Sequence, residues 1–195
     1  MWSTLPDVET ISGGKLDVPH FTGKAKIDPI VERARFANHS FVIAPMYYQN
    51  LVGVMAPQEQ EDGSLGWALP LDPAVRGIHM GDIHELGDVV AGAFTHPHIA
   101  GHGEYLPLVG DFMSFNEIVA TLNRQGHRLS FKRVPDHVFA GRFPGAAEMA
   151  ATFKHFEANT YLPSEDRIAL ARKVAGRRPT PFATWARANF PRRSD

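Results

Sequence analysis

A histidine and a lysine stand four residues apart near the start of the chain, at positions 20 and 24. Side chains at positions i and i+4 of a helix lie on one face, so His20 and Lys24 can face the same pocket if the segment is helical. An imidazole can act as a base near neutral pH, and a nearby ammonium lowers its pKa. A lysine can also donate a hydrogen bond to a sugar hydroxyl. The alternative, which the spacing alone favours, is an exposed histidine and lysine on a surface helix.

The residues after Lys24 have the spacing of an amphipathic helix that a proline interrupts. The apolar positions of this helix are Ile27, Ile30, Val31 and Ala34. Proline lacks an amide hydrogen and disfavours helix at the residue before it. The helix is therefore either kinked at Asp28-Pro29 or restarts there, with Asp28 as the N-cap and Pro29 at the first helical position.

Three histidines at positions 96, 98 and 102 could offer imidazoles to a metal ion. They stand in a Pro/Gly loop without the fixed geometry that a metal site needs, so we expect no metal there. Gly101-His102-Gly103 is not a dinucleotide loop, because that loop opens a helix and here a strand follows. The sequence contains neither a Gly-rich phosphate loop nor a Gly-x-Ser-x-Gly nucleophile elbow.

Composition and charge exclude several functional classes. The chain has 195 residues, 44% of them hydrophobic, a net charge of −1 and no cysteine. These values suit one soluble domain and exclude disulfides and thiol chemistry. Residues 164–195 carry eight Lys or Arg against three Asp or Glu, but a basic tail on a near-neutral chain rarely marks a nucleic-acid site. With no signal peptide and no apolar run of membrane-spanning length, we expect an intracellular protein, cytoplasmic or nuclear, without membrane partners.

Strand and helix patterns alternate through residue 134, which predicts an α/β fold. Expected strands are 40–45, 67–71 (a possible edge strand), 78–83, 105–109 and 129–134, and Asp7 to Asp17 is expected to be a loop. A capping box at Ser114 begins a helix that Gly126 ends. We expect one α/β core that buries Phe41, Val42, Ile43, Val89, Val90, Ile118, Val119 and Leu122.

The rest of the chain is predicted to be helical. Helices are expected over 147–156, from a Ser164 cap to 174, and over 180–185. We interpret residues 1–195 as one domain with an α/β part (1–134) and a helical C-terminal part (135–195).

Six segments, taken in order, resemble the NmrA-like family of atypical short-chain dehydrogenase/reductase-fold proteins. They are Trp2-Ser3-Thr4-Leu5-Pro6, Val18-Pro19-His20-Phe21-x-x-Lys24-Ala25, Ala44-Pro45-Met46-Tyr47-Tyr48-Gln49-Asn50, Asp82-Ile83 with Gly87-Asp88-Val89-Val90, Gly110-Asp111 with the capping box, and Pro179-Thr180-Pro181-Phe182-x-x-Trp185. Their order carries the resemblance. The family includes a regulator of nitrogen metabolite repression, an NADPH sensor and various reductases.

The resemblance implies a partial Rossmann-like parallel sheet with a helical C-terminal substrate side. It covers the family's second half, because relatives begin with a Gly-rich strand–turn–helix that this sequence lacks. The implied cofactor is NAD or NADP, and without the phosphate loop we expect this chain alone not to bind it tightly. The implied site residues are Ser3, His20 and Lys24 (catalytic), Pro45, Tyr47, Tyr48 and Asn50 (substrate-binding), and Lys24 and Pro45 (cofactor-binding).

The Tyr-x-x-x-Lys pair of ordinary short-chain dehydrogenases is absent, and His20 stands where the tyrosine would be. Three functions stay open: a truncated NmrA-like oxidoreductase or redox sensor, a cofactor-independent enzyme on a small organic substrate, and a non-catalytic regulator that binds a protein partner. A homodimer could cover the apolar sheet edge that the absent strands would leave. We expect His20, Lys24 and residues 47–50 to line one cleft at the carboxyl edge of the sheet, and any chemistry to take place there.

Overall fold

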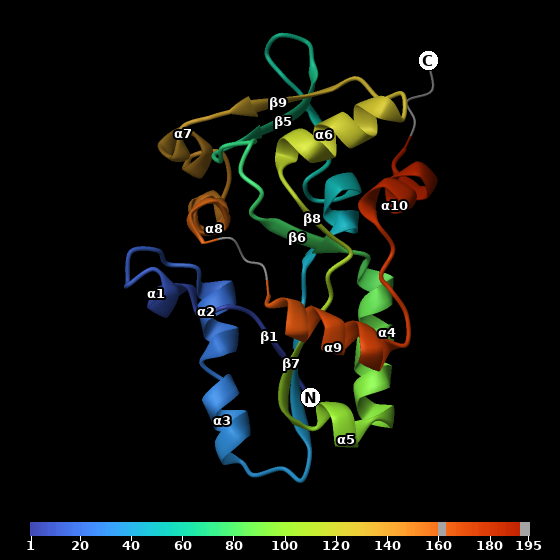
Figure 1. Ribbon diagram of the computed structural model, residues 1–195. Coiled ribbons are helices and arrows are strands. Elements are labelled where there is room, and N and C mark those ends of the chain that lie inside the picture. The colour runs from blue at the N-terminus through green and yellow to red at the C-terminus, as the bar shows by residue number, and fades with distance from the viewer. Residues whose placement is uncertain (160–162, 192–195) are drawn as a thin grey trace.

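The computed structural model describes residues 1–159 and 163–191 and shows an α/β fold (Figure 1). Its strands are β1 (Trp2–Thr4), β2 (His39–Ile43), β3 (Met46–Tyr47), β4 (Gln58–Glu59), β5 (Leu65–Leu69), β6 (Ile78–Gly81), β7 (His102–Pro107), β8 (Asp111–Met113) and β9 (Leu129–Arg133). Its helices are α1 (Val8–Ile11), α2 (Pro19–Ala25), α3 (Asp28–Arg33), the 3-10 helix η1 (Tyr48–Val52), α4 (Ile83–Thr95), α5 (Pro97–Ala100), α6 (Phe115–Arg124), α7 (Asp136–Ala140), α8 (Ala146–Ala158), α9 (Glu165–Ala175) and α10 (Phe182–Asn189).

The sheet that positions the site is formed by β1, β2 and β7, in that order and all parallel. In its register Trp2 lies beside Phe41, which lies beside Tyr105, and Thr4 lies beside Ile43. Residues side by side in a parallel register point to the same face, so these five side chains share one face. Among the described residues β1 pairs with β2 alone, so its other edge has no strand partner there.

Helices cover both faces of this sheet. Figure 1 shows α2 and α3 on one side of β1 and β7 and α4 on the other. The face toward α4 and α9 is a small apolar core, in which branched side chains of the strands meet small residues of the helices. Its buried members are Val42, Val89, Ala93, Ala100, Leu106, Leu108, Ala171 and Val174. These contacts hold the sheet rigid behind the face that α2 and α3 cover.

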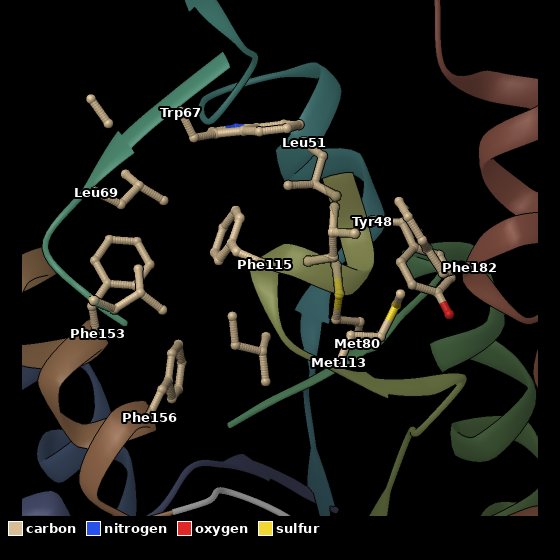
Figure 2. Packing of buried hydrophobic residues seen from close by; sticks show 14 of the residues in the cluster. Tyr48, Leu51, Trp67, Leu69, Met80, Met113, Phe115, Phe153, Phe156 and Phe182 are labelled. Atoms are coloured by element: carbon tan, nitrogen blue, oxygen red, sulfur yellow. The ribbon is translucent and has the colours of Figure 1, made fainter. Parts of the chain in front are cut away.

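Two further three-stranded sheets, β3-β6-β8 and β4-β5-β9, surround a larger core. Figure 2 shows its aromatic centre, where Phe115 lies between the methionines of β6 and β8 and the phenylalanines of α8. Helix α6 closes this core from one side. As the sequence predicts, Ser114 and Glu117 form a complete capping box at its start, and Gly126 follows its end at φ +97°. Only glycine adopts that φ without strain.

The predicted burial is largely confirmed, because six of the eight residues are buried and Val90 and Val119 are half-buried. The expectation of one core is wrong: Val42 and Val89 belong to the smaller core, whereas Ile118 and Leu122 belong to the larger one.

Four local predictions differ from the structure. The Pro/Gly loop expected around His96 and His98 contains the one-turn helix α5. The strand expected at 67–71 lies at 65–69, between β4 and β9 and not at an edge, because β9 adds in parallel to its free side. The loop expected from Asp7 to Asp17 contains the one-turn helix α1, which Asp7 caps. The helix does restart near Pro29, but Ile27 is the N-cap and Asp28 is already helical. The carboxyl group of Asp28 makes tertiary hydrogen bonds instead of capping.

Candidate functional site

Lys24 and Ser3 are in direct contact where α2 crosses β1. The ammonium Nζ of Lys24 donates to the backbone carbonyl of Ser3 at 3.1 Å and lies 3.5 Å from the Ser3 hydroxyl. It also lies 5.8 Å from the centre of the Trp2 ring, and the Trp2 indole donates to the carbonyl of Lys24 at 3.1 Å. These contacts fix a half-buried positive charge on the edge strand β1, and they leave ammonium hydrogens for a further acceptor.

His20 stands one turn before Lys24, and its imidazole points to a different element. Its Nδ1 is 2.5 Å from Oε1 of Glu148 on α8, and its backbone N–H donates to the same oxygen at 3.0 Å. The hydrogen bonds from His20 lower the pKa of the Glu148 carboxyl. Nearly half of the His20 side chain is exposed, so this pair lies at the surface.

Tyr48 is inside the protein. It has no exposed surface, its hydroxyl donates to the carbonyl of Thr180 at 3.1 Å, and its ring packs against Phe182 and Trp185 with centroids 5.3 Å away (Figure 2). Burial raises the pKa of its phenol well above the ordinary value. The Tyr48 side chain thus joins α10 to the larger core, and its substrate-binding role stays a prediction.

The other residues of this segment differ in exposure. Pro45 is buried, whereas Tyr47 and Asn50 are half-buried. Between them Gln49 bridges to the start of α4, because its amide donates to Asp82 at 2.6 Å and accepts from the N–H of Ile83 at 3.1 Å. The segment therefore connects β3 to α4.

Of the seven predicted site residues, the structure joins Ser3 and Lys24 by hydrogen bonds. It turns His20 toward α8 and places Tyr48 in the core. Two cavities formed by the described residues have volumes of about 680 and 820 Å³, and none of the seven residues lines either one. The single cleft expected for His20, Lys24 and residues 47–50 therefore does not coincide with these cavities.

Sequence reasoning missed Asp28. This carboxyl is buried, and its Oδ2 accepts from the Thr4 hydroxyl at 2.9 Å and from the Tyr105 hydroxyl at 3.1 Å. Burial raises the pKa of Asp28, and burial together with the negative charge of Asp28 raises the pKa of Tyr105 to about 12. The available signal was its position four residues after Lys24, on the side of the helix that faces the sheet.

The histidines at 96, 98 and 102 form no metal cluster. Within the described ranges, no three His, Cys, Asp or Glu side chains are grouped so that they could hold an ion. The imidazole of His96 is used locally, with Nδ1 3.0 Å from both the Thr95 hydroxyl and the carbonyl of Gly92.

The sequence profile of the NmrA-like family matches residues 1–186. The chain belongs to the NmrA-like family. It is 32% identical over 132 residues to an NmrA-like family domain-containing protein of Dictyostelium discoideum, a match that covers 64% of this chain and 42% of that protein.

Solved NmrA-like structures share the fold. The crystal structure of NmrA, a negative transcriptional regulator, in complex with NAD matches with a TM-score of 0.75 at 21% identity. The match covers 97% of this chain and 63% of the NmrA chain. The complex of NmrA with NADP matches with a TM-score of 0.75 at 20% identity. An NADPH-dependent quinone oxidoreductase from Escherichia coli, complexed with NADPH, matches with a TM-score of 0.71 at 14% identity. The match covers 97% of this chain and 64% of the oxidoreductase chain. The chain thus spans under two thirds of the length of these relatives. None of the helices described is long and apolar enough to cross a membrane.

Proposed function

We propose that the chain forms the nicotinamide-facing, substrate-side part of an NAD(P)-responsive NmrA-like protein, with Lys24 as the residue that meets the nicotinamide nucleotide. The position of Lys24 carries this proposal, because Ser3 and Trp2 hold its ammonium at the edge strand β1. A fixed ammonium can donate to ribose hydroxyls, which are acceptors. Complexes of solved relatives with NAD, NADP and NADPH support the same ligand class.

The proposed response is binding and not hydride transfer. Ordinary short-chain dehydrogenases use a tyrosine four residues before the lysine, and His20 occupies that position here, tied to Glu148. Two of the tyrosine hydroxyls are engaged elsewhere, that of Tyr48 with Thr180 and that of Tyr105 with Asp28. A sensor that changes its association with a protein partner fits these contacts better than a reductase.

The affinity of this chain alone is expected to be weaker than micromolar. In dinucleotide-binding folds a Gly-rich turn and a helix N-terminus supply most of the contacts to the pyrophosphate. The sequence holds no such turn, so the nicotinamide end is the part that this chain contacts.

Thermal unfolding in the presence of millimolar NADPH or NADP tests the proposal. A ligand that binds only the folded state raises its stability by RT ln(1 + [L]/Kd), so even weak binding shifts Tm at high concentration. We expect a rise in Tm that Lys24→Met largely removes and Lys15→Met, a change at an exposed lysine, leaves unchanged. Equal shifts in the two variants would contradict the role of Lys24.

A second candidate function rests on the contact between His20 and Glu148. A carboxylate that holds Nδ1 fixes the orientation of the imidazole and leaves Nε2 for proton transfer, which suits a cofactor-independent acid–base enzyme. Hydrolysis of an activated ester near neutral pH tests it. This function requires His20→Gln and Glu148→Gln each to remove most of the rate, with exposed His84→Gln as the matched control. Equal rates in all three variants would exclude it.

A further inference from the structure

The cavity of about 680 Å³ lies over the face of the sheet that Thr4 and Tyr105 share. Helices α2 and α3, the end of α8 and the start of α9 form its other sides. Its volume is within the range of small-molecule sites, about 300–1,000 Å³. Apolar side chains make much of the wall, namely Leu5, Pro6, Ile11, Ala25, Pro29, Ile43 and Ala158.

Asp28 is the polar group of this wall that lacks a full set of partners. The residue is 9% exposed, and its Oδ2 already accepts from Thr4 and Tyr105. Its Oδ1 is buried, and no atom of residues 1–159 or 163–191 donates to it. Buried carboxylate oxygens are nearly always hydrogen-bonded, so Oδ1 has an acceptor position that a donor of a ligand can fill.

The charges around the cavity favour a cation. Asp7, Asp28 and Glu32 contribute carboxyl groups, and Arg167 contributes one guanidinium. Arg167 stacks on the Tyr105 ring, 4.8 Å from its centre, and Asp7 caps α1. An anionic ligand would meet an excess of negative charge here. An ammonium would form a charge-assisted hydrogen bond with Oδ1, which is about twice as strong as a neutral one.

We propose that this cavity binds a small organic ammonium compound, with its amine on Asp28 and its apolar body against Leu5, Ile11 and Ile43. The amine has three hydrogens, so it can reach the Tyr105 hydroxyl oxygen as well as Oδ1 of Asp28. The wider part of the cavity then shields the apolar body from water.

The side chains of this site differ from those of the proposed nicotinamide contact, although α2 and α3 lie on the same side of the sheet (Figure 1). Asp28 and Tyr105 line the cavity, whereas Lys24 and Ser3 do not. Changes at Asp28 and at Lys24 therefore test the two proposals separately.

Three probes with one ring system and different head groups test the charge preference: tryptamine, tryptophol and indole-3-acetate. Binding to the full chain is followed from backbone NMR shifts. We expect saturable shifts around Thr4, Asp28 and Tyr105 with tryptamine, a Kd at least tenfold lower than that of tryptophol, and no saturation with indole-3-acetate. Equal affinity for the three probes, or tryptamine shifts that map elsewhere, would overturn the proposal.

Two variants test the position of the amine. Asp28→Asn should raise the Kd for tryptamine at least tenfold, whereas Asp17→Asn, at an exposed carboxyl, should leave it unchanged. Ala158→Leu adds volume at an exposed position of the wall, so it keeps the charge and the fold and should also weaken binding. Unchanged affinity in Ala158→Leu, or in a folded Asp28→Asn protein, would contradict the assignment.

Discussion

Lys24 and Asp28 are one helical turn apart in sequence and bind consecutive residues of β1. Lys24 donates to Ser3 and Asp28 accepts from Thr4. The two residues stand on separate helices, because α2 ends at Ala25 and α3 begins at Asp28. Both helices lie on one side of the sheet (Figure 1), and they bring a cation and a buried carboxyl to one edge strand of three residues.

Removing the hydroxyl of Thr4 should destabilise the fold. Thr4→Val keeps the shape of the side chain but deprives the buried Asp28 carboxyl of a donor, so we expect a loss of about 1–3 kcal/mol in the free energy of unfolding. Urea denaturation measures it. The control is Thr95→Val, because the Thr95 hydroxyl makes hydrogen bonds only near the end of α4, on the surface. Equally small losses of stability in the two variants would contradict a structural role for the Thr4–Asp28 hydrogen bond.

Asp28 should make stability depend on pH. Burial raises the pKa of Asp28 in the folded protein above the ordinary value of an aspartate, so folding favours its protonated form. The stabilisation from that proton is complete below the unfolded pKa and is lost as pH rises through the folded pKa. Relative to wild type, Asp28→Asn should therefore gain stability as pH increases from acid toward neutral. Parallel pH profiles for the two proteins would show that Asp28 titrates normally.

The contribution of Glu148 to stability should depend on pH in the opposite direction to that of Asp28. Its folded pKa is lowered by hydrogen bonds from His20, so its contribution is present above the unfolded pKa and is lost as pH falls through the lowered folded value. The pair is partly exposed, and we expect Glu148→Gln to cost about 0.2–1 kcal/mol at neutral pH. Denaturation at pH 7 and at pH 3 measures the stability cost of Glu148→Gln at each pH. An equal cost at pH 7 and pH 3 would exclude the ion pair.

Tyr48 should behave as a core residue. Tyr48→Phe removes the hydrogen bond to Thr180 and leaves the Thr180 carbonyl without this donor, which should cost about 1 kcal/mol of stability. It should leave the nucleotide-induced Tm shift unchanged. The space is tight, since a Cβ on Gly110 would lie 2.5 Å from the Tyr48 hydroxyl. A variant that loses the nucleotide response at full stability would return Tyr48 to the binding site.

Local signals in the sequence predicted much of the fold. The Ser114 capping box involves residues three apart, and the apolar periodicity of Val89, Ile118 and Leu122 is visible within one helix each. These features need no knowledge of distant partners, which explains why they were predictable.

The site was less predictable because its contacts are long-range. Tyr48 follows a strand as a cleft residue would. Only its contact with Thr180, which lies 132 residues further on and just before α10, shows that it is buried. Likewise the role of Asp28 depends on Tyr105, which lies 77 residues away. The sequence around Asp28 indicated a cap, and only the tertiary fold supplies the hydroxyl groups that bind it.

The Trp2 indole N–H provides the most direct measurement of the central claim, because it donates to the carbonyl of Lys24. Its NMR cross-peak can be followed while nicotinamide mononucleotide or adenosine monophosphate is added to the full chain. The account predicts a saturable shift with nicotinamide mononucleotide, a much smaller one with adenosine monophosphate, and loss of the response in Lys24→Met but not in Lys15→Met. An unmoved Trp2 resonance at high millimolar nicotinamide mononucleotide, or the same response to both nucleotides, would contradict it.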